Sequence, residues 1–521
     1  MTPKHLPWHL KSLRDWRWAL VIAFTSGLGM GLTPAPVNAW LLAWGALAPL
    51  WLLTQVHAPK MALLLGAAWG VGYHGAAISW ITGIHPMTWL GVPWLASLAI
   101  AAFCWIAITL WGAALVAVWA WAMALYRWMG PPKTSTWTRV LVGVALWCAL
   151  EWIWSQSPLW WTSLSYTQSP HNLAILHLGQ LSGPLTVTAA LVLINGLVAE
   201  VLSTRGRRQS MGWVAILLVS LHILGFGLYS QPLDQPPATA LKVGVIQGNI
   251  PNEIKLYSEG GRRALEGYTS GYRALAEQGV EAVLTPETAL PFLWTSSSAT
   301  YSSFHRAILE QGVVAWVGAI GQQGKNITNS LFTITGQGEI FSRYDKVNLV
   351  PVGEYIPFQR WLGSLIERLS PLDAHLVPGS PRHTFNTPFG QAIAGICYDS
   401  AFAEHFRRQT AAGGEFLLSA SNNAHYSSAM PAQHHAQDVM RAIESDRWAV
   451  RATNTGYSGI VDPHGNTHWL SGLNTYQIHA DRIYRRHTQT PYVRWGDWLT
   501  PLLSVLAIGT CVMKRAGWRE Q

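Results

Sequence analysis

The sequence predicts a polytopic α-helical membrane domain joined to a layered α/β domain that lies outside the cytoplasmic membrane. Of the 521 residues, 50% are hydrophobic, 30 are tryptophan and 12% are charged, which is too apolar for an ordinary soluble protein. Long apolar runs fill the first 230 residues and return near the C-terminus, but none occurs between 231 and 495. In that interval short strand-like and helical patterns alternate. The chain is therefore expected to contain two different kinds of structure.

Eight uninterrupted apolar runs have roughly the 17 to 25 residues that a membrane-spanning helix needs. They cover 18–35, 38–55, 61–83, 95–125, 138–156, 178–202, 212–230 and 497–513. The first run is not expected to be a cleavable signal peptide, because other spans follow it. The resulting division is a membrane domain over 1–230 with seven helices, a linker over 231–240, a soluble domain over 241–496, an eighth helix over 497–513 and a tail over 514–521.

The basic residues of the loops predict how these helices are oriented, because short loops rich in Lys and Arg stay in the cytoplasm. Such residues precede the first run or follow even-numbered runs: Lys4, Lys11, Arg14, Arg17, Lys60, Arg127, Lys133, Arg139, Arg205, Arg207, Arg208, Lys514, Arg515 and Arg519. Loops 84–94 and 157–177 contain none. We therefore expect a multi-pass inner-membrane protein with both termini cytoplasmic and the soluble domain periplasmic. The net charge of +9 owes much to these anchors and does not indicate nucleic-acid binding.

The soluble block predicts a layered α/β domain with mixed sheets. After the proline-rich linker, "LKVGVIQGN" has the β-branched composition of a first strand and ends at Gly-Asn. Further strand-like runs are "VEAVLTPE", "VVAWVGAIG", "NSLFTIT", "GEIFSRYDKV", "QAIAGICYD", "EFLLSASNN", "RWAVRATN", "YSGIVDPHG" and "THWLSG". Helical patterns such as "GRRALEGYTSGYRALAEQG" and "HHAQDVMRAIESD" separate several of them. This alternation is typical of layered α/β folds rather than of a helical bundle or an all-β sandwich.

Cys397 is the one cysteine of the soluble block. The chain has four cysteines, and Cys104, Cys148 and Cys511 lie inside apolar runs. Outside the cytoplasm cysteines are usually paired in disulfides, but Cys397 has no partner in its own domain. Such a thiol is either reactive or buried and inert, and the count of cysteines leaves both alternatives open.

Two charged residues stand, like Cys397, where a predicted strand ends and a loop begins. They are Glu287 in "LTPETALP" and Lys346 in "YDKVNLVPVGEYIPF". Catalytic groups of α/β folds commonly occupy strand ends. A cysteine that attacks a carbonyl needs a base for its proton and a positive group near the developing oxyanion, which a carboxylate and a lysine supply. Spacing alone does not show that the three residues converge.

The amino-acid sequences of these segments resemble the motifs of a known family. "PETALP", "DKVNLVPVGEYIPF" and "GICYD" resemble the Glu, Lys and Cys motifs of the nitrilase (carbon-nitrogen hydrolase) superfamily, and most closely its membrane branch, the apolipoprotein N-acyltransferase family. Other segments resemble that branch in the same order: "LEWIW" (150–154), "SLSY" (163–166), "GNIP" (248–251), "SNNAHY" (421–426), "RATNTGYSGIVDPHG" and "TPYVRWGDW" (490–498). The resemblance thus covers nearly the whole chain.

The resemblance implies a four-layer αββα sandwich on a membrane base and a two-step acyl transfer without a cofactor. By position, Glu287 would be the general base, Lys346 the oxyanion stabiliser and Cys397 the nucleophile, with the backbone N–H of Tyr398 helping to hold the oxyanion. The acyl donor would be a membrane phospholipid. The acceptor would be the α-amine of a diacylglyceryl-modified N-terminal cysteine of a lipoprotein. The protein is expected to act as a monomer.

A second glutamate and several departures from the family pattern also matter. Glu354, in "GEYIPF", would support the lysine, although a surface glutamate is the alternative. Asp399 stands where the family usually has glutamate, so a supporting role there requires the backbone to compensate for the shorter side chain. Three further positions depart from the usual residue: Leu256 and Thr285 replace tryptophans, and Trp154 replaces an arginine.

Some residues are candidates for lipid contact. Both substrates carry acyl chains, which cost about 0.8 kcal/mol per CH₂ to expose to water. Phe358 and Trp361 lie on one face of a predicted amphipathic helix, and Phe292 and Trp294 follow the Glu motif. For both pairs, packing within the domain is an equally good interpretation. Asn422 is expected to order the loop beside the nucleophile, or simply to form a turn.

The remaining polar residues predict less. His434 and His435 begin a predicted helix and are expected to face solvent, and no metal site is expected because no third ligand stands at zinc spacing. Glu151 and His74 lie within predicted spans, where they would either shape a headgroup cavity or form structural hydrogen bonds. Two other functions stay open: a membrane-tethered amidase for a small carbon-nitrogen substrate, and a non-catalytic lipid-binding assembly protein.

Overall fold

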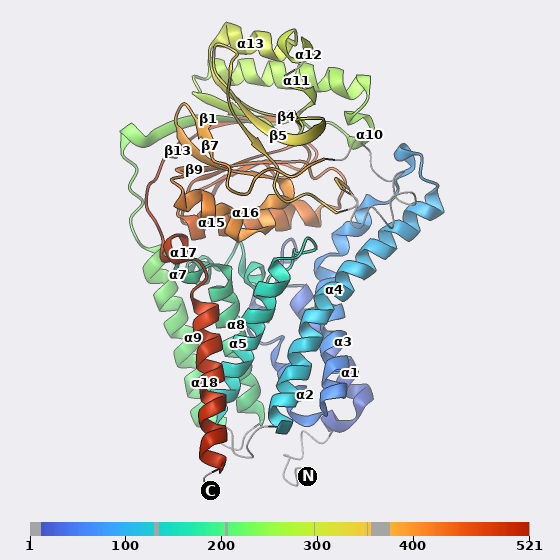
Figure 1. The fold of residues 1–521 in the computed structure, drawn as a ribbon, viewed down its shortest axis with the longest axis vertical. Coiled ribbons are helices and arrows are strands. Elements are labelled where there is room, and N and C mark those ends of the chain that lie inside the picture. The colour runs from blue at the N-terminus through green and yellow to red at the C-terminus, as the bar shows by residue number, and fades with distance from the viewer. Residues whose placement is uncertain are drawn as a thin grey trace. The chain divides into compact units, whose positions relative to one another are not determined.

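Two compact units make up the chain (Figure 1). The computed structural model describes residues 12–129, 135–203, 207–295, 297–351, 353–355 and 376–519. The helical unit comprises Met1–Ile81, Ala102–Gln231 and Trp495–Gln521. The sheet unit comprises Thr82–Ala101 and Pro232–Arg494. Each unit thus gathers segments that lie far apart in the sequence.

The helical unit is built from apolar helices. They are α1 (Trp16–Gly31), α2 (Ala48–Val56), α3 (Pro59–Ala77), most of α4 (Trp94–Met129), α5 (Thr136–Ser155), α6 (Leu173–Leu176), α7 (Gly179–Ser182), α8 (Pro184–Ser203), α9 (Arg207–Tyr229) and α18 (Leu499–Arg519). Among the described residues, four helices are long and apolar enough to cross a membrane: α4, α5, α8 and the Met211–Tyr229 part of α9. The expected number of eight spans is therefore not confirmed and stays a prediction.

Two of the runs expected as single helices are broken. Run 38–55 forms a short 3₁₀ helix, Trp40–Trp44, followed by α2. The first amides of a helix have no partner within it, and here the side chain of Asn195 accepts from Leu47 N at 2.9 Å and Ala48 N at 3.0 Å. Run 178–202 is interrupted at Gly183, whose φ of 81° is unfavourable for residues with a side chain. The proline that follows then begins α8.

Glycines and tryptophans pack the interior of the helical unit. A Cβ at Gly27 of α1 would lie 2.0 Å from the carbonyl oxygen of Trp69 in α3, so only glycine permits this approach. Close contact through small residues is how apolar helices associate in lipid. The ring of Trp51 lies edge-on to Trp119 at 5.2 Å, and Trp119 lies edge-on to Trp147 at 5.3 Å. All three indoles are buried.

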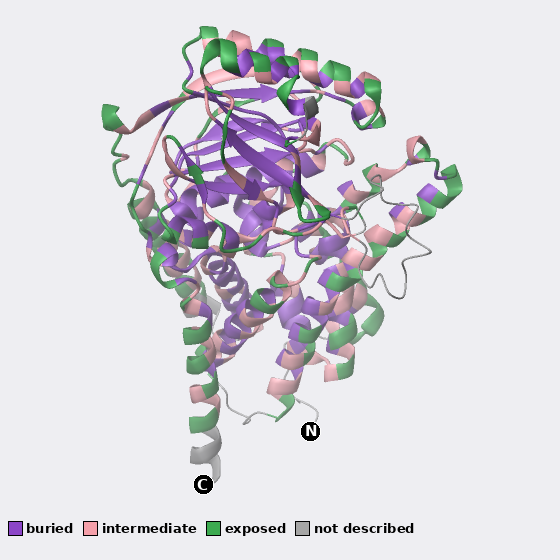
Figure 2. Ribbon diagram, turned by 45° about the horizontal axis from the view of Figure 1, so that its top comes forward, coloured by how far each residue is buried: buried purple, intermediate pink, exposed green. Residues whose placement is uncertain are grey.

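The outer faces of the helical unit are apolar and exposed (Figure 2). In the apolar window of α9 only 6% of residues are buried. Its exposed large hydrophobic residues are Met211, Trp213, Ile216, Val219, Ile223, Leu224 and Phe226. Apolar surface of this extent is not stable in water and indicates contact with lipid. The chain is thus a membrane protein.

The sheet unit contains two mixed sheets. Strands of the first are β1 (Ala240–Gln247), β2 (Ala282–Leu284), β3 (Leu290–Leu293), β4 (Val314–Gln323), β5 (Asn326–Ile334), β6 (Ile340–Asp345) and β13 (Gln477–Tyr484), in the order β13-β1-β2-β4-β5-β6 with β3 beside β4. Strands of the second are β7 (Phe385–Thr387), β8 (Gly390–Ile396), β9 (Phe416–Ser421), β10 (Ala449–Thr453), β11 (Gly459–Val461) and β12 (Thr467–Leu470), in the order β12-β11-β10-β9-β8-β7. β1, β2 and β4 are parallel, as are β8, β9 and β10.

Helices cover both outer faces of the paired sheets, which gives four α/β/β/α layers (Figure 1). These helices are α10 (Asn252–Lys255), α11 (Ser258–Glu277), α12 (Ser297–Thr300), α13 (Ser303–Gln311), α15 (Ala403–Ala411) and α16 (Ala429–Ser445). The short α17 (Pro491–Trp495) spans the point in the sequence where the sheet unit ends. α11 buries Ala264, Tyr268, Tyr272 and Leu275, which recur at helical spacing. Between the sheets, fully buried aromatic residues such as Trp316 and Phe416 fill the core. This layering matches the expected α/β sandwich.

Candidate active site

The structure brings the three strand-end residues into one cluster. Glu287 follows β2, Lys346 follows β6 and Cys397 follows β8. Lys346 Nζ donates to Glu287 Oε1 at 3.0 Å. The backbone N–H of Asn422 donates to Glu287 Oε2 at 2.8 Å, and its carbonyl oxygen lies 3.9 Å from the sulfur of Cys397. Glu287 and the thiol therefore share Asn422 as a common neighbour.

Glu354 completes a buried network of charges around Lys346. Lys346 Nζ donates to Glu354 Oε1 at 2.9 Å, and the lysine side chain is 1% exposed. Asn329 Nδ2 donates to both carboxylates, at 2.7 Å to Glu287 and 3.1 Å to Glu354. Val350 N donates to the other oxygen of Glu354 at 2.7 Å. Of the two alternatives for Glu354, contact with Lys346 rather than a surface position is thus supported, and buried charges without such partners would be strongly unfavourable.

The protonation states follow from burial and from these neighbours. Burial opposes ionisation of Glu287, but Lys346 and Lys255 hold the pKa of this carboxyl below its usual value. Burial, together with the charge of Glu287, raises the pKa of Glu354. Burial raises the pKa of the Cys397 thiol to about 12, with Glu287 adding to the effect and Lys346 opposing it. The resting site therefore combines an ionised carboxylate with a protonated thiol.

The backbone at Cys397 is held in an unusual conformation. Its φ is 51°, in the left-handed region that side chains other than glycine rarely adopt. Cys397 begins a 3₁₀ turn, Cys397–Ala401, at the end of β8. His434 Nε2 donates to the carbonyl oxygen of Cys397 at 2.8 Å, while its Nδ1 accepts from Asn423 Nδ2 at 3.1 Å. His434 is fully buried and His435 nearly so, which corrects the expectation that they face solvent.

Asp399 ties the nucleophile turn to the lysine loop. Its carboxylate is fully buried and accepts from Ile396 N at 3.0 Å and from Tyr344 OH at 2.8 Å. The other oxygen accepts from the backbone and side-chain N–H groups of Asn348, each at 2.8 Å. Asn348 lies two residues after Lys346. The short aspartate side chain therefore reaches all of its donors, and the departure from the family pattern leaves it a structural partner of both loops.

Several residues of the cluster were not found by sequence reasoning. Lys255, in α10, is 6% exposed and donates its Nζ to the carbonyl oxygen of Glu287 at 3.0 Å. Asn329 lies on β5, at the point where it contacts both carboxylates. Asn454 follows β10 and donates to the side chain of Asn422 at 3.1 Å. Asn329 and Asn454 have one sequence signal, their position in predicted strands, whereas Lys255 has none.

The side chain of Asn422 links three loops. Its Nδ2 donates to Asn252 Oδ1 at 3.1 Å, and its Oδ1 accepts from Asn454. Asn454 in turn donates to the carbonyl oxygen of Ile250 at 2.7 Å. Asn422 thus joins the ends of β1, β9 and β10. The aromatic ring of Tyr398 packs edge-on against Phe402 at 5.1 Å.

The structure separates the candidates for lipid contact. Trp294 is 4% exposed and belongs to the core under α11 and α13, with Phe292 stacked on it at 6.2 Å. Packing within the domain therefore explains Trp294. Phe358 and Trp361 lie outside the described residues. Leu256, one of the departures, is 41% exposed, whereas Thr285 is fully buried and accepts from Gly318 N at 3.0 Å.

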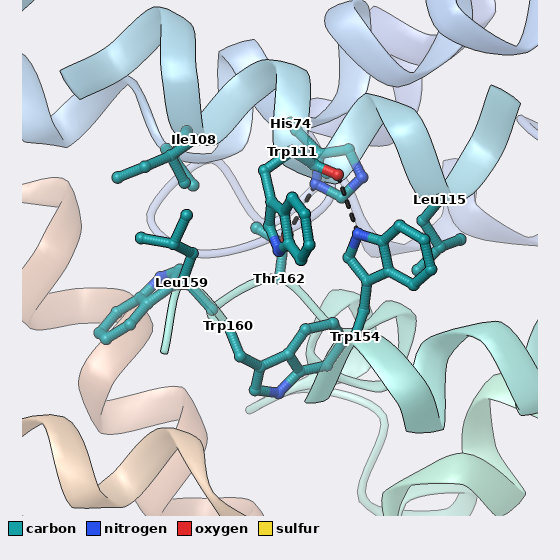
Figure 3. A pocket seen from close by; sticks show the side chains of 11 residues that line it. His74, Ile108, Trp111, Leu115, Trp154, Leu159, Trp160 and Thr162 are labelled. Atoms are coloured by element: carbon teal, nitrogen blue, oxygen red, sulfur yellow. Dashed lines mark hydrogen bonds between the residues drawn. The ribbon is translucent and has the colours of Figure 1, made fainter. Parts of the chain in front are cut away.

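A pocket in the helical unit contains none of the predicted catalytic residues (Figure 3). His74 Nδ1 lies 2.7 Å from Thr162 Oγ1, and Trp154 Nε1 donates to the carbonyl oxygen of Trp111 at 2.9 Å. The rings of Trp111 and Trp154 stack at 5.3 Å. Trp154, which stands where the family often has arginine, thus stacks on the ring of Trp111 and donates to its backbone carbonyl oxygen.

Glu151 is explained by structural hydrogen bonds. Its carboxylate accepts from Trp147 Nε1 at 2.9 Å, Ser163 Oγ at 2.6 Å and Thr188 Oγ1 at 2.9 Å. Of the two alternatives for this residue, the structural one is therefore supported.

Comparison with known proteins shows which families the chain resembles. Residues 26–197 match the apolipoprotein N-acyltransferase N-terminal domain, and residues 242–483 match the carbon-nitrogen hydrolase family. The apolipoprotein N-acyltransferase of Nostoc sp. is 60% identical over 482 residues, which are 91% of this chain and 95% of that protein. The enzyme of the same name from Synechocystis sp. is 50% identical over 506 residues, covering 92% and 97%.

A solved structure of an amidase from Nesterenkonia sp. is also similar, with 18% identity, a TM-score of 0.37 and coverage of 51% of this chain and 97% of the amidase. The identities to the curated relatives extend over both units. The chain therefore belongs to the apolipoprotein N-acyltransferase family.

Proposed function

We propose that this protein transfers an acyl chain from a membrane phospholipid to the α-amine of the N-terminal diacylglyceryl-cysteine of lipoproteins, through a thioester on Cys397. The observation that carries the proposal is the buried Glu287–Lys346–Glu354 cluster beside Cys397, in a chain whose other unit exposes apolar helices. Family membership supports the same activity. A membrane anchor suits substrates that both carry acyl chains, because these chains need not cross water.

In the first step Cys397 is acylated. Glu287 removes the thiol proton as the sulfur attacks the carbonyl carbon of the donor ester, and the π electrons move onto the carbonyl oxygen. Lys346 and the backbone N–H of Tyr398 stabilise this oxyanion. When the oxyanion collapses, the ester C–O bond breaks, the leaving alkoxide takes the proton from Glu287 and a lysophospholipid departs. An acyl thioester remains on Cys397.

In the second step the acceptor amine attacks the thioester. Glu287 takes a proton from the attacking nitrogen, the tetrahedral intermediate passes through the same oxyanion site, and the C–S bond breaks to return the proton to the sulfur. An amide is formed on the lipoprotein and free Cys397 is regenerated. A thioester suits this exchange because it reacts readily with amines and lets two large lipids use one site in turn. Glu354 holds Lys346 in place throughout.

The arrangement in the membrane follows from the proposed activity. We propose a multi-pass inner-membrane monomer with eight spans, both termini in the cytoplasm and residues 241–496 on the periplasmic side, joined to the first seven spans by the linker 231–240. The basic residues of the loops support this orientation. Phe358 and Trp361 remain candidates for contact with the incoming acyl chains.

Intact mass spectrometry tests the proposal. Purified protein in phospholipid nanodiscs should gain the mass of one acyl chain, and neutral hydroxylamine should remove it. Cys397→Ala should abolish the adduct, whereas Cys148→Ala, which removes a buried cysteine of α5, should retain it. A diacylglyceryl lipopeptide should discharge the adduct and become N-acylated.

If the wild-type protein forms no adduct, the proposed acyltransferase function is wrong. An adduct that water but not the lipopeptide discharges would instead indicate an ester or amide hydrolase.

A further inference from the structure

Lys255 is a buried cation at the candidate site that the proposed mechanism does not use. It ends α10, the short helix that follows β1, and is 6% exposed. Its Nζ donates to the backbone carbonyl oxygen of Glu287 at 3.0 Å. Lysine is almost never this buried without a carboxylate partner. In the described residues, however, Lys255 forms no ion pair, whereas Lys346 contacts two carboxylates.

The charges that face Lys255 belong to the reacting groups. Its ammonium lowers the pKa of Glu287 and is in electrostatic contact with Cys397. A further titratable neighbour among the described residues is His425, whose ring stacks on Trp89 at 6.0 Å. Burial and the charge of Lys255 lower the pKa of His425 to about 4, so this histidine is neutral near pH 7. Lys255 thus lies among an ionised base, a thiol and a neutral ring.

This placement has a consequence for the first half of the reaction. When the proton of Cys397 moves to Glu287, negative charge moves to the sulfur and then to the ester oxygen. A cation that forms no ion pair of its own can stabilise that charge wherever it lies in the buried site, because charge interactions are strong where water is excluded. The same cation keeps Glu287 ionised before the step begins.

We propose that Lys255 is an electrostatic positioning residue of acylation: it fixes the backbone of Glu287, keeps that carboxylate ionised and stabilises the negative charge that develops at Cys397. The inference rests on the proposed thioester function. Lys255, which lies in α10, would thus act at the site together with Lys346, the lysine that the sequence motifs indicate.

The test is the rate of the first half-reaction as a function of pH, measured without acceptor so that the amine of the lipopeptide does not titrate. Burial lowers the pKa of Lys255 to about 8. The pKa of Cys397 is about 12, and two carboxylates hold the pKa of Lys346 high. Neither group therefore titrates near pH 8. The wild-type acylation rate should therefore fall as pH rises through about 8.

Lys255→Met has nearly the same shape without the charge, so it removes the electrostatic effect and leaves the packing. At pH 7 it should acylate about tenfold more slowly than wild type, since one unit of pKa corresponds to a factor of ten. Above about pH 9, where wild-type Lys255 is mostly neutral, the two rates should converge. The acid limb of the variant should lie at higher pH, because Glu287 has lost a neighbouring cation.

Lys242→Met is the matched control, because Lys242 also donates its Nζ to a backbone carbonyl, that of Gln278, at the opposite end of β1. It should keep the wild-type rate and profile. Equal rates and identical pH profiles for Lys255→Met and wild type would overturn the inference, whereas absence of any acyl adduct on wild type would overturn the proposed function. Should Lys255→Met not fold, Lys255→Gln replaces it. If neither folds, a wild-type rate that stays constant from pH 7 to 9.5 contradicts the proposal.

Discussion

Glu287 of the sheet unit and Glu151 of the helical unit are both buried carboxylates, 6% and 2% exposed, but their partners differ in kind. Glu287 contacts the ammonium of Lys346 and receives N–H bonds from Asn329 and Asn422. Glu151 receives its hydrogen bonds from neutral hydroxyl and indole groups. Glu287 thus lies beside a charged group, whereas the side-chain donors to Glu151 are neutral.

The difference shows that buried carboxylates in this chain can be suited to different roles. Neutral donors satisfy the oxygens of Glu151 and join α5 to α8 and to the loop at Ser163, which is a structural role. Cations beside Glu287 keep it ionised although it is buried, which suits the general-base role proposed for it. Burial alone therefore does not distinguish the proposed base from a structural carboxylate, whereas the charge of the partners does.

Removing the charge of Glu287 should have the largest effect. Glu287→Gln keeps the shape of the side chain but abolishes the base, so the rate of Cys397 acylation should fall about 10³-fold. Intact mass spectrometry over time measures this rate. Glu281→Gln, at an exposed position just before β2, is the control and should keep the wild-type rate. A loss of less than about fivefold for Glu287→Gln would show that the cluster is structural, like that of Glu151.

Asp399→Asn should have the next largest effect, because it exchanges one acceptor oxygen for an amide among groups that all donate. We expect about 2 kcal/mol lower stability from the unmatched donors. Acylation should slow about 10²-fold as the nucleophile turn shifts relative to Lys346. Chemical denaturation and the acylation assay measure the two effects. Unchanged acylation in a destabilised variant would contradict the link between the two loops.

The dependence of the acylation rate on pH below 7 tests whether Glu287 is ionised before the reaction. Because the pKa of Glu287 is lowered, acylation should persist to below the usual carboxyl range, and then fall about tenfold for each further unit of pH. The stability that this carboxylate contributes has the same sign: it is present above the unfolded pKa and is lost as pH falls through the folded pKa. Acylation that already declines near pH 6 would contradict an ionised resting base.

Glu151→Gln should have the smallest effect on catalysis. Its amide nitrogen would face the donor of Trp147 or of the two hydroxyls, so one hydrogen bond is lost at a cost of about 1 kcal/mol. The rate of acylation by phospholipid should stay within a factor of about two. Thermal unfolding in detergent reports the stability. A loss of acylation as large as that of Glu287→Gln would erase the distinction between the two carboxylates.

Much of the sheet unit was predictable from local patterns. The β-branched runs that end in Gly-Asn, Pro-Glu or Cys-Tyr correspond to β1, β2 and β8, and the strand-end positions of Glu287, Lys346 and Cys397 followed from them. β13 was not predicted, because its polar alternation is that of an edge strand and its partner, β1, lies more than two hundred residues earlier. Its pairing is a tertiary fact that local sequence does not contain.

The partners of the site were harder to predict than its strand ends. His434 looks like the polar start of a helix, and only the carbonyl oxygen of Cys397 and the amide of Asn423 explain its burial. Lys255 carried no prediction from the sequence, and only its contact with the backbone of Glu287 places it at the site. Run 38–55 reads as one helix, but Asn195, from a distant helix, stabilises the break. In each case a residue remote in sequence decides the environment.

The left-handed backbone at Cys397, with φ of 51°, sets stability against activity at a single position. Glycine adopts this conformation without strain, whereas a residue with a Cβ pays about 1 kcal/mol for it. Cys397→Gly should thus be more stable than Cys397→Ala, although both lack the thiol. A nucleophile that must project from such a turn excludes the residue that the turn itself would favour, so selection for thermal stability alone would drive this site toward inactivity.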